Sequence, residues 1–237
     1  AGTEVMRGGY TLTHRDWRDP PSRRHGQSRP GNPPHRQVES RFKLAKRIIK
    51  ALSMKVCILS DSHDHIALLD AAVADAKSAG AEAVLHCGDL VAPSTLHCLE
   101  KYGLPVHVIH GNNTGDLYAL TRLAHKPGGV VRFHGMDAGI ELAGRRIFLV
   151  HYPHYAHALA ATGDWDLVCC GHSHAVEIDE RNNCTGGTTH LVNPGTVGGV
   201  GRAPATWVMA DLATMRFEVH EVPKSLEYRD AAVARHD

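Results

Sequence analysis

The sequence is poor in the features that mark several large classes of protein. Aromatic residues make up 5% of its 237 residues, whereas the charged content of 22% is close to ordinary globular usage. No stretch approaches the roughly 18 consecutive apolar residues of a membrane-spanning helix. The six cysteines form no CxxC pair, which argues against a thiolate zinc site or a dithiol redox motif. A P-loop and a GxSxG nucleophile elbow are also missing, which argues against a P-loop nucleoside triphosphatase or an α/β-hydrolase.

The cysteines that are present favour a reducing environment. Cys57, Cys87, Cys169 and Cys170 lie in apolar runs, where a reduced and buried thiol is expected. The sequence shows no secretory signal with an apolar core near its beginning. We therefore expect a cytoplasmic protein.

Charge is distributed unevenly along the chain. Residues 1–53 hold 12 Lys and Arg against 4 Asp and Glu, whereas residues 54–237 hold 14 against 21. The first segment is rich in Arg, Pro, Gly and His and is expected to be a mostly disordered basic extension. Residues 41–52 within it could form an amphipathic helix that lies on an anionic surface, binds nucleic acid or packs loosely on the domain. Residues 54–237 are expected to form one domain.

From Met54 onward, short apolar runs alternate with segments of helical periodicity. Strands are expected at 54–61, 83–87, 106–110, 140–142, 146–150, 167–170, 190–192, 205–210 and 216–222. Helices are expected at 65–79, 93–101, 116–124 and 154–162. The early strands alternate with helices and the later strands follow one another, which predicts a layered α/β (α+β) fold with mixed sheets.

Polar side chains that can bind metals follow the expected strands at the points where the strands end. They are Asp61, His63, Asp89, Asn112, His151, His172 and His174. Glycine directly precedes three of them, at positions 88, 111 and 171, and is expected to permit a sharp turn out of the strand. Because ligands bind at the carboxyl ends of strands in open α/β sheets, we expect these side chains to share one site.

The chemistry of this set indicates a transition metal. Carboxylates together with imidazoles suit Mn, Fe, Zn or Ni better than Ca, and the chain contains 19 histidines. Structural roles remain open for single residues: Asp61 could cap the helix at 65–79, Asp89 could cap the turn before Pro93, and Asn112 could be a turn residue.

Other histidines lie close to these motifs. His65 and His154 could touch a substrate phosphate, but a structural role is the preferred interpretation. His86 and His110 are expected to be hydrogen-bonded to backbone carbonyls.

The motifs resemble the calcineurin-like metallophosphoesterase family, in particular its small bacterial and archaeal phosphodiesterases. The matching pieces are D-S-H at 61–63, G-D at 88–89, G-N at 111–112, the histidine at 151, G-H-S-H at 171–174 and N-P-G at 193–195. The resemblance covers about residues 54–222. It implies a four-layer αββα sandwich, in which helices flank two mixed β-sheets.

The resemblance also implies a site for two divalent ions, with Mn expected and Ni, Fe, Zn or Mg as alternatives. The implied ligands are Asp61, His63 and His174 for one ion and Asn112, His151 and His172 for the other, with Asp89 bridging them. Two ions about 3.5–4 Å apart can share a hydroxide that attacks a phosphoester. A phosphodiester is the expected substrate, and Asp89, Asn112 and Asn113 are the expected catalytic residues.

One position departs from the family pattern. Many members have a histidine directly after the asparagine of the G-N motif, where it helps the leaving group depart, whereas this chain has Asn113. A carboxamide can donate a hydrogen bond but supplies no proton at neutral pH. We therefore expect a preference for good leaving groups, as in aryl or activated diesters. No inserted cap domain interrupts the motifs, which predicts an open site with loose specificity.

Two other functions remain open. A non-catalytic metal-binding scaffold of the same fold is the main alternative, because a retromer subunit of similar fold serves as a scaffold. A nucleic-acid-processing enzyme is the second, because residues 1–53 are basic, although the acidic remainder gives it no support. The sequence predicts no oligomeric state.

Overall fold

Residues 53–222 are described by a computed structural model of the chain, and the helix expected at 41–52 lies outside them. Six strands form the first sheet, in the order β11-β10-β1-β2-β3-β4. They are β1 (Lys55–Leu59), β2 (Ala81–His86), β3 (Val106–Val108), β4 (Val131–Phe133), β10 (Thr206–Asp211) and β11 (Arg216–Glu221). The first four run parallel to one another, and β10 is antiparallel to both β1 and β11.

Five strands form the second sheet, in the order β5-β6-β7-β9-β8. They are β5 (Asp137–Leu142), β6 (Arg145–Val150), β7 (Leu167–Cys169), β8 (Val176–Asn182) and β9 (Thr188–Pro194). The central strands β6, β7 and β9 are parallel, whereas β5 and β8 pair antiparallel at the two edges. Both sheets are therefore mixed, as predicted.

Helical segments connect the parallel strands. They are α2 (Ile66–Ser78), the 3₁₀ helix η1 (Pro93–Leu96), α3 (His97–Glu100), α4 (Leu117–Ala124) and α5 (Pro153–Thr162). The helix expected at 93–101 begins at Pro93, but its first turn is 3₁₀. Gly163 ends α5 with φ of 79°, a left-handed conformation that glycine adopts without a steric penalty.

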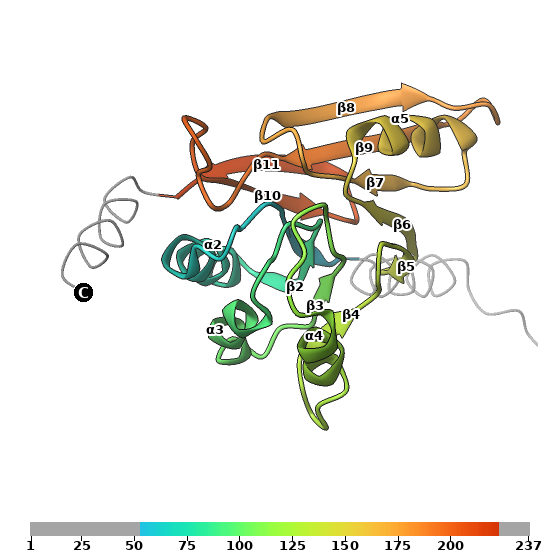
Figure 1. Ribbon diagram of the computed structural model, residues 1–237. Coiled ribbons are helices and arrows are strands. Elements are labelled where there is room, and N and C mark those ends of the chain that lie inside the picture. The colour runs from blue at the N-terminus through green and yellow to red at the C-terminus, as the bar shows by residue number, and fades with distance from the viewer. Residues whose placement is uncertain (1–52, 223–237) are drawn as a thin grey trace, which may run out of the picture. The chain divides into compact units, whose positions relative to one another are not determined.

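Three apolar clusters explain how the layers pack. Leu69 and Val73 of α2 are buried with Val84 of β2 between the helices and the first sheet. A second cluster joins the two sheets and includes Ile58 and Leu149. A third lies between α5 and the outer face of the second sheet. The order helix, sheet, sheet, helix confirms the predicted four-layer αββα sandwich (Figure 1).

Two strands were not expected from the sequence. β4 has only three residues and is the edge of the first sheet. β8 carries the sequence VEIDERN at the edge of the second sheet, and none of its residues is fully buried. Short or charged edge strands lack the apolar run by which a buried strand is recognised.

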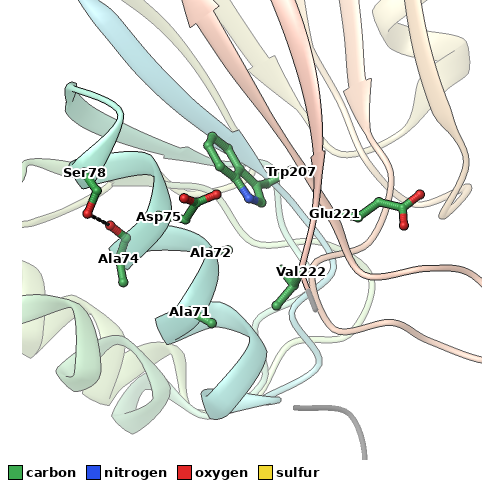
Figure 2. A pocket seen from close by; sticks show the side chains of 8 residues that line it. All are labelled: Ala71, Ala72, Ala74, Asp75, Ser78, Trp207, Glu221 and Val222. Carbon is green, nitrogen blue, oxygen red and sulfur yellow. Dashed lines mark hydrogen bonds between the residues drawn. The ribbon is translucent and has the colours of Figure 1, made fainter. Parts of the chain in front are cut away.

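A cavity of about 440 Å³ lies between α2 and the β10–β11 hairpin (Figure 2). The small side chains Ala71, Ala72 and Ala74 of α2 leave this space open opposite Trp207. The Trp207 indole is buried and stacks on His220, with ring centroids 4.2 Å apart. The described residues that line this cavity include none of the metal-competent side chains predicted from the sequence, so those side chains lie elsewhere.

The cluster between the sheets should dominate the stability of the fold. Leu149 is fully buried there, whereas Leu117 at the start of α4 is 39% exposed. We expect Leu149→Ala to lower the free energy of unfolding by about 3 kcal/mol, because it removes buried methyl groups and leaves a cavity. Leu117→Ala, the same chemical change, should cost less than about 1 kcal/mol. Equal losses in urea denaturation would contradict this assignment of the core.

Candidate metal centre

The two sheets present the carboxyl ends of their parallel strands at one place, and all seven metal-competent residues gather there. Asp61 and His63 follow β1, Asp89 follows β2, Asn112 follows β3, His151 follows β6, and His172 and His174 follow β7. The contacts between these residues, described below, form a closed ring. The alternation of short strands with helices creates this arrangement, because each parallel strand ends at the same edge.

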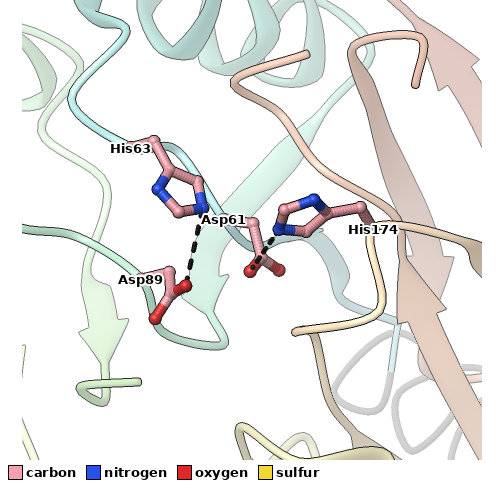
Figure 3. A group of neighbouring side chains, drawn as sticks. All are labelled: Asp61, His63, Asp89 and His174. Atoms are coloured by element: carbon pink, nitrogen blue, oxygen red, sulfur yellow. Dashed lines mark ion pairs between the residues drawn. The ribbon is translucent and has the colours of Figure 1, made fainter. Parts of the chain in front are cut away.

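One half of the ring contains two carboxylates and two imidazoles (Figure 3). Nε2 of His174 lies 3.3 Å from Oδ1 of Asp61, and Nε2 of His63 lies 3.5 Å from Oδ2 of Asp89. Each of the four side chains offers one ligand atom, and these atoms all lie within 4.8 Å of one another. Both carboxylates are buried, and both imidazoles are partly exposed. This group alone could hold one metal ion.

The other half of the ring is arranged around Asn112. Its Oδ1 lies 2.9 Å from Nε2 of His151 and 2.7 Å from Nδ1 of His172. Oδ1 of Asp89 is 3.3 Å from the same His151 nitrogen. The backbone N–H of His172 donates to Oδ2 of Asp61 at 2.9 Å, and the rings of His63 and His174 lie edge to face with centroids 5.4 Å apart, which closes the ring. The two oxygens of Asp89 therefore face different halves of the ring.

The tautomer of His151 follows from its other nitrogen. Nδ1 lies 2.8 Å from the carbonyl oxygen of Cys87, which can only accept, so Nδ1 carries the proton and donates. In the neutral ring Nε2 then presents a lone pair, and this lone pair faces the oxygens of Asn112 and Asp89. Three acceptors thus converge, two of them on the buried residues His151 and Asp89 and one on the exposed Asn112, an arrangement that a cation stabilises.

Unpartnered polar atoms at the site also indicate a cation. Within the described part of the chain, Asp61 Oδ1 and His63 Nε2 are buried without a hydrogen-bond partner. Burial raises the pKa of the Asp61 carboxyl above its usual range. Buried polar groups are rarely left without partners, and a bound cation would satisfy both atoms. The residues present therefore fit a metal.

The backbone around the site is strained. Of the eight non-glycine residues with positive φ in the described chain, six lie here, with φ between 42° and 68°. They are Asp61, His63, Asp64, Asp89, His172 and His174. Such conformations cost on the order of 1 kcal/mol each and persist where the surrounding structure enforces them. They turn each side chain sharply from its strand toward the common centre.

The three glycines before these residues have two different roles. Gly88 has φ of 104°, as expected for a sharp turn. Gly111 and Gly171 have no positive φ, so the expected turn is not the reason for glycine there. A Cβ at Gly111 would collide with Asp89 Oδ1 and lie 2.7 Å from Cε1 of His151. Absence of a side chain at Gly111 and Gly171 therefore makes room for the site residues themselves.

The structural alternatives for Asp61 and Asp89 are wrong. The side chain of His65 caps α2 by accepting from the N–H of Leu68 at 3.3 Å. The side chain of Asp64 holds the turn before Pro93, because its oxygens accept from Ala92 N at 2.8 and 2.9 Å. Asp64 was not recognised from the sequence, although it lies directly beside the D-S-H motif.

A buried histidine links two of the motifs. His86 is fully buried, and its Nε2 lies 3.0 Å from the hydroxyl of Ser62, while Nδ1 accepts from the N–H of Gly88 at 3.3 Å. Its partners are thus a hydroxyl and a backbone N–H, and the prediction that it bonds to a backbone carbonyl is wrong. Burial lowers the pKa of His86 to about 3, so the ring is neutral. By contrast, His110 does contact a carbonyl, that of Gly111, at 3.2 Å.

The N-P-G motif and the threonine that follows it bond to two of the loops that carry the site. Nδ2 of Asn193 donates to the carbonyl oxygen of Gly171 at 2.8 Å and to the hydroxyl of Ser173 at 3.0 Å. The hydroxyl of Thr196 donates to the carbonyl oxygen of Asp61 at 2.8 Å. These bonds hold the G-H-S-H loop and the D-S-H loop in place. The sequence showed the motif, but gave no indication of what it holds.

Asn113 contacts the central carboxylate. Its backbone N–H donates to Asp89 Oδ1 at 2.8 Å, and its Nδ2 donates to Asp89 Oδ2 at 2.7 Å. The side chain therefore orients Asp89. His154, by contrast, is exposed and packs against the ring of Tyr155, with centroids 4.1 Å apart.

A four-layer sandwich with carboxylates and imidazoles at the ends of its parallel strands defines a metal-binding α/β protein. Residues 54–215 match the calcineurin-like phosphoesterase superfamily domain, and the chain belongs to that superfamily. Phosphodiesterase MJ0936 of Methanocaldococcus jannaschii is 26% identical over 146 residues, which cover 60% of this chain and 83% of the relative.

Solved structures share the fold. A novel archaeal phosphodiesterase has a TM-score of 0.63 at 22% identity, covering 71% of this chain and 100% of its own. The phosphoesterase Yfce of E. coli has a TM-score of 0.50 at 18% identity, covering 72% and 100%. Vacuolar protein sorting 29 of Cryptosporidium parvum has a TM-score of 0.50 at 16% identity, covering 72% and 97%. These similarities establish the fold alone, and an argument about activity has to rest on the site.

The close packing at Gly111 should control metal affinity. We expect Gly111→Ala to weaken Mn²⁺ binding by roughly tenfold or more, because the added Cβ must displace Asp89 and His151. Gly187→Ala is the matched control, since its Cβ would find its nearest atom 3.5 Å away and no site residue nearby. Calorimetric titration with Mn²⁺ measures both. Unchanged affinity in Gly111→Ala would exclude the proposed crowding.

Burial of His86 predicts a pH dependence of stability in metal-free protein. Its folded pKa of about 3 lies below the value of 6.5 expected when unfolded, so the unfolded chain binds more protons between these values. The contribution of His86 to the free energy of unfolding is thus fully present above pH 6.5 and is lost as the pH drops toward 3, by on the order of 4 kcal/mol. His86→Gln should flatten this slope in urea denaturation at pH 7 and pH 4. Parallel curves for both proteins would refute the assignment.

Proposed function

We propose that the chain is a metal-dependent phosphodiesterase that hydrolyses phosphoester bonds at a site for two divalent ions. The observation that carries this proposal is the closed ring of seven residues, in which carboxylate, amide and imidazole atoms that can bind a metal lie close together. A superfamily of phosphoesterases and a phosphodiesterase relative support the class of reaction.

The ring divides into two ligand sets. In our proposal Asp61, His63 and His174 hold one ion, Asn112, His151 and His172 hold the other, and Asp89 bridges them. The two Asp89 oxygens support the bridge, because one faces His63 and the other faces His151. Imidazole with carboxylate and amide oxygens suits Mn²⁺, with Ni, Fe, Zn or Mg as alternatives.

When bound, the two ions would supply Lewis acidity and a hydroxide nucleophile at neutral pH. The protein's own residues supply orientation. Asn113 fixes both oxygens of Asp89, and the carbonyl oxygen of Cys87 fixes the ring of His151. Such supporting contacts hold ligands in the geometry that the reaction needs.

Asn113 supplies no proton to the departing leaving group. Its carboxamide is engaged with Asp89 and is no acid at neutral pH. The reaction should therefore favour esters whose leaving groups are stable as anions, as in aryl diesters.

A non-catalytic scaffold is the competing function, and a vacuolar sorting protein shares the fold. Buried acceptors and six strained residues lower the stability of the fold. A scaffold that does not use this site has no compensating function for them, and we therefore favour the enzyme.

Location and larger partners belong to the same proposal. All six cysteines are free thiols, which supports the cytoplasm. In the described residues, no helix has the length and apolar character to cross a membrane. Binding of nucleic acid by residues 1–53 would be a separate function. Salt-dependent binding that is lost when those residues are deleted would demonstrate it.

The proposal predicts about two Mn²⁺ per chain and hydrolysis of bis(4-nitrophenyl) phosphate. We expect Asp89→Asn and His172→Ala to reduce the rate by roughly a hundredfold or more, because each removes a proposed ligand. An alkyl phosphomonoester should react more slowly than the aryl diester. Metal content by elemental analysis and release of nitrophenolate measure these quantities.

His97→Ala serves as the control, because this histidine is exposed on α3 and outside the ring. It should retain both metal and activity. Absence of bound metal together with absence of turnover with any divalent ion would favour the scaffold. Faster reaction of the alkyl monoester would remove the argument from Asn113.

A further inference from the structure

An apolar cavity of about 400 Å³ lies between α5 and the outer face of β5 and β6. Phe148 and Val150 of β6 form its floor, and Tyr155, Ala158 and Leu159 of α5 form its wall. Asp137 contributes the one carboxylate, and no Lys or Arg occurs among the described residues that line the cavity. The cavity is thus unsuited to a phosphate and suited to an uncharged ring.

A row of aromatic rings connects this cavity to the metal centre. Val150 directly precedes His151 in the sequence. The ring of Tyr152 lies against His172, with centroids 4.8 Å apart at an angle of 65°. The ring of Tyr155 lies 6.0 Å from that of Tyr152 and is also part of the cavity wall. Tyr155 is 54% exposed, so a ligand can reach it.

The spacing of the rings restricts the ligand. Tyr152 contacts both His172 and Tyr155, with centroid distances of 4.8 and 6.0 Å, so a ligand whose phosphate lies at His172 has to extend past Tyr152 to stack on Tyr155. A sugar between the phosphate and an aromatic ring supplies this length. A cavity of this volume lies within the range of about 300–1,000 Å³ for small-molecule sites.

We propose that Tyr155 and the adjoining cavity bind the base of a nucleoside phosphoester whose phosphate lies at the metal centre. Tyr152 then borders the sugar, and Tyr155 provides a face on which the base stacks. The inference rests on the proposed function, because the metal centre places the phosphate. It concerns how the nucleoside is recognised, and it does not depend on which ester bond of the phosphate is cleaved.

Adenosine 5′-monophosphate and ribose 5-phosphate test this inference, because they share the phosphate and the sugar and differ in the base. In calorimetric titrations of the Mn²⁺-loaded protein, we expect the nucleotide to bind about tenfold more tightly. Tyr155→Ala should abolish this preference and leave ribose 5-phosphate unaffected, whereas Tyr155→Phe keeps the ring and the preference. Ala158→Phe should also abolish it by filling the cavity.

Ala74→Phe is the matched control, since it places the same side chain in the other cavity, on α2 (Figure 2). It should leave the preference intact. Equal affinity of the two ligands for the unsubstituted protein, or no binding of either, would overturn the inference, and so would a preference that survives Tyr155→Ala. Turnover of bis(4-nitrophenyl) phosphate without a base preference overturns the inference alone. A base preference without turnover of any diester overturns the proposed function alone.

Discussion

The convergence of lone pairs at the end of the two sheets is the constraint on which the rest of the structure depends. Asp89 is its centre, with His63 near one oxygen and His151 near the other. Acceptors placed this close repel one another unless a positive charge lies between them. Positive φ values turn the site residues toward one another, and glycine at 111 leaves room for them. The hydrogen bonds from Asn193 hold the G-H-S-H loop in place.

Much of this could be predicted from the sequence, because strand ends are easy to recognise. A buried apolar run followed by Asp or by Gly-Asp indicates both the strand and the place where it stops. The gathering of seven side chains followed from that pattern. The order of strands and helices predicted a layered fold with mixed sheets, and the resemblance to calcineurin-like phosphoesterases implied its four layers. Strand β8 could not be recognised, because its residues are half-exposed or exposed and its sequence is charged.

The supporting contacts could not be predicted, because they depend on distances across the fold. Asp64 resembles any polar loop residue until the turn at Ala92 is seen beside it. His86 lies 24 positions from its partner Ser62. The role of Gly111 was misjudged for the same reason: a turn is a local property, whereas the space beside Asp89 and His151 belongs to the packed molecule.

The ring draws its members from both sheets, and this has a consequence for the whole molecule. Asp61, His63, Asp89 and Asn112 follow strands of one sheet, whereas His151, His172 and His174 follow strands of the other. An ion held by ligands from both sheets would cross-link the sheets in addition to its role in the proposed reaction, because a ligand that binds only the folded chain stabilises it. Scarcity of metal in a cell would then weaken the packing of one sheet on the other and also abolish the proposed activity.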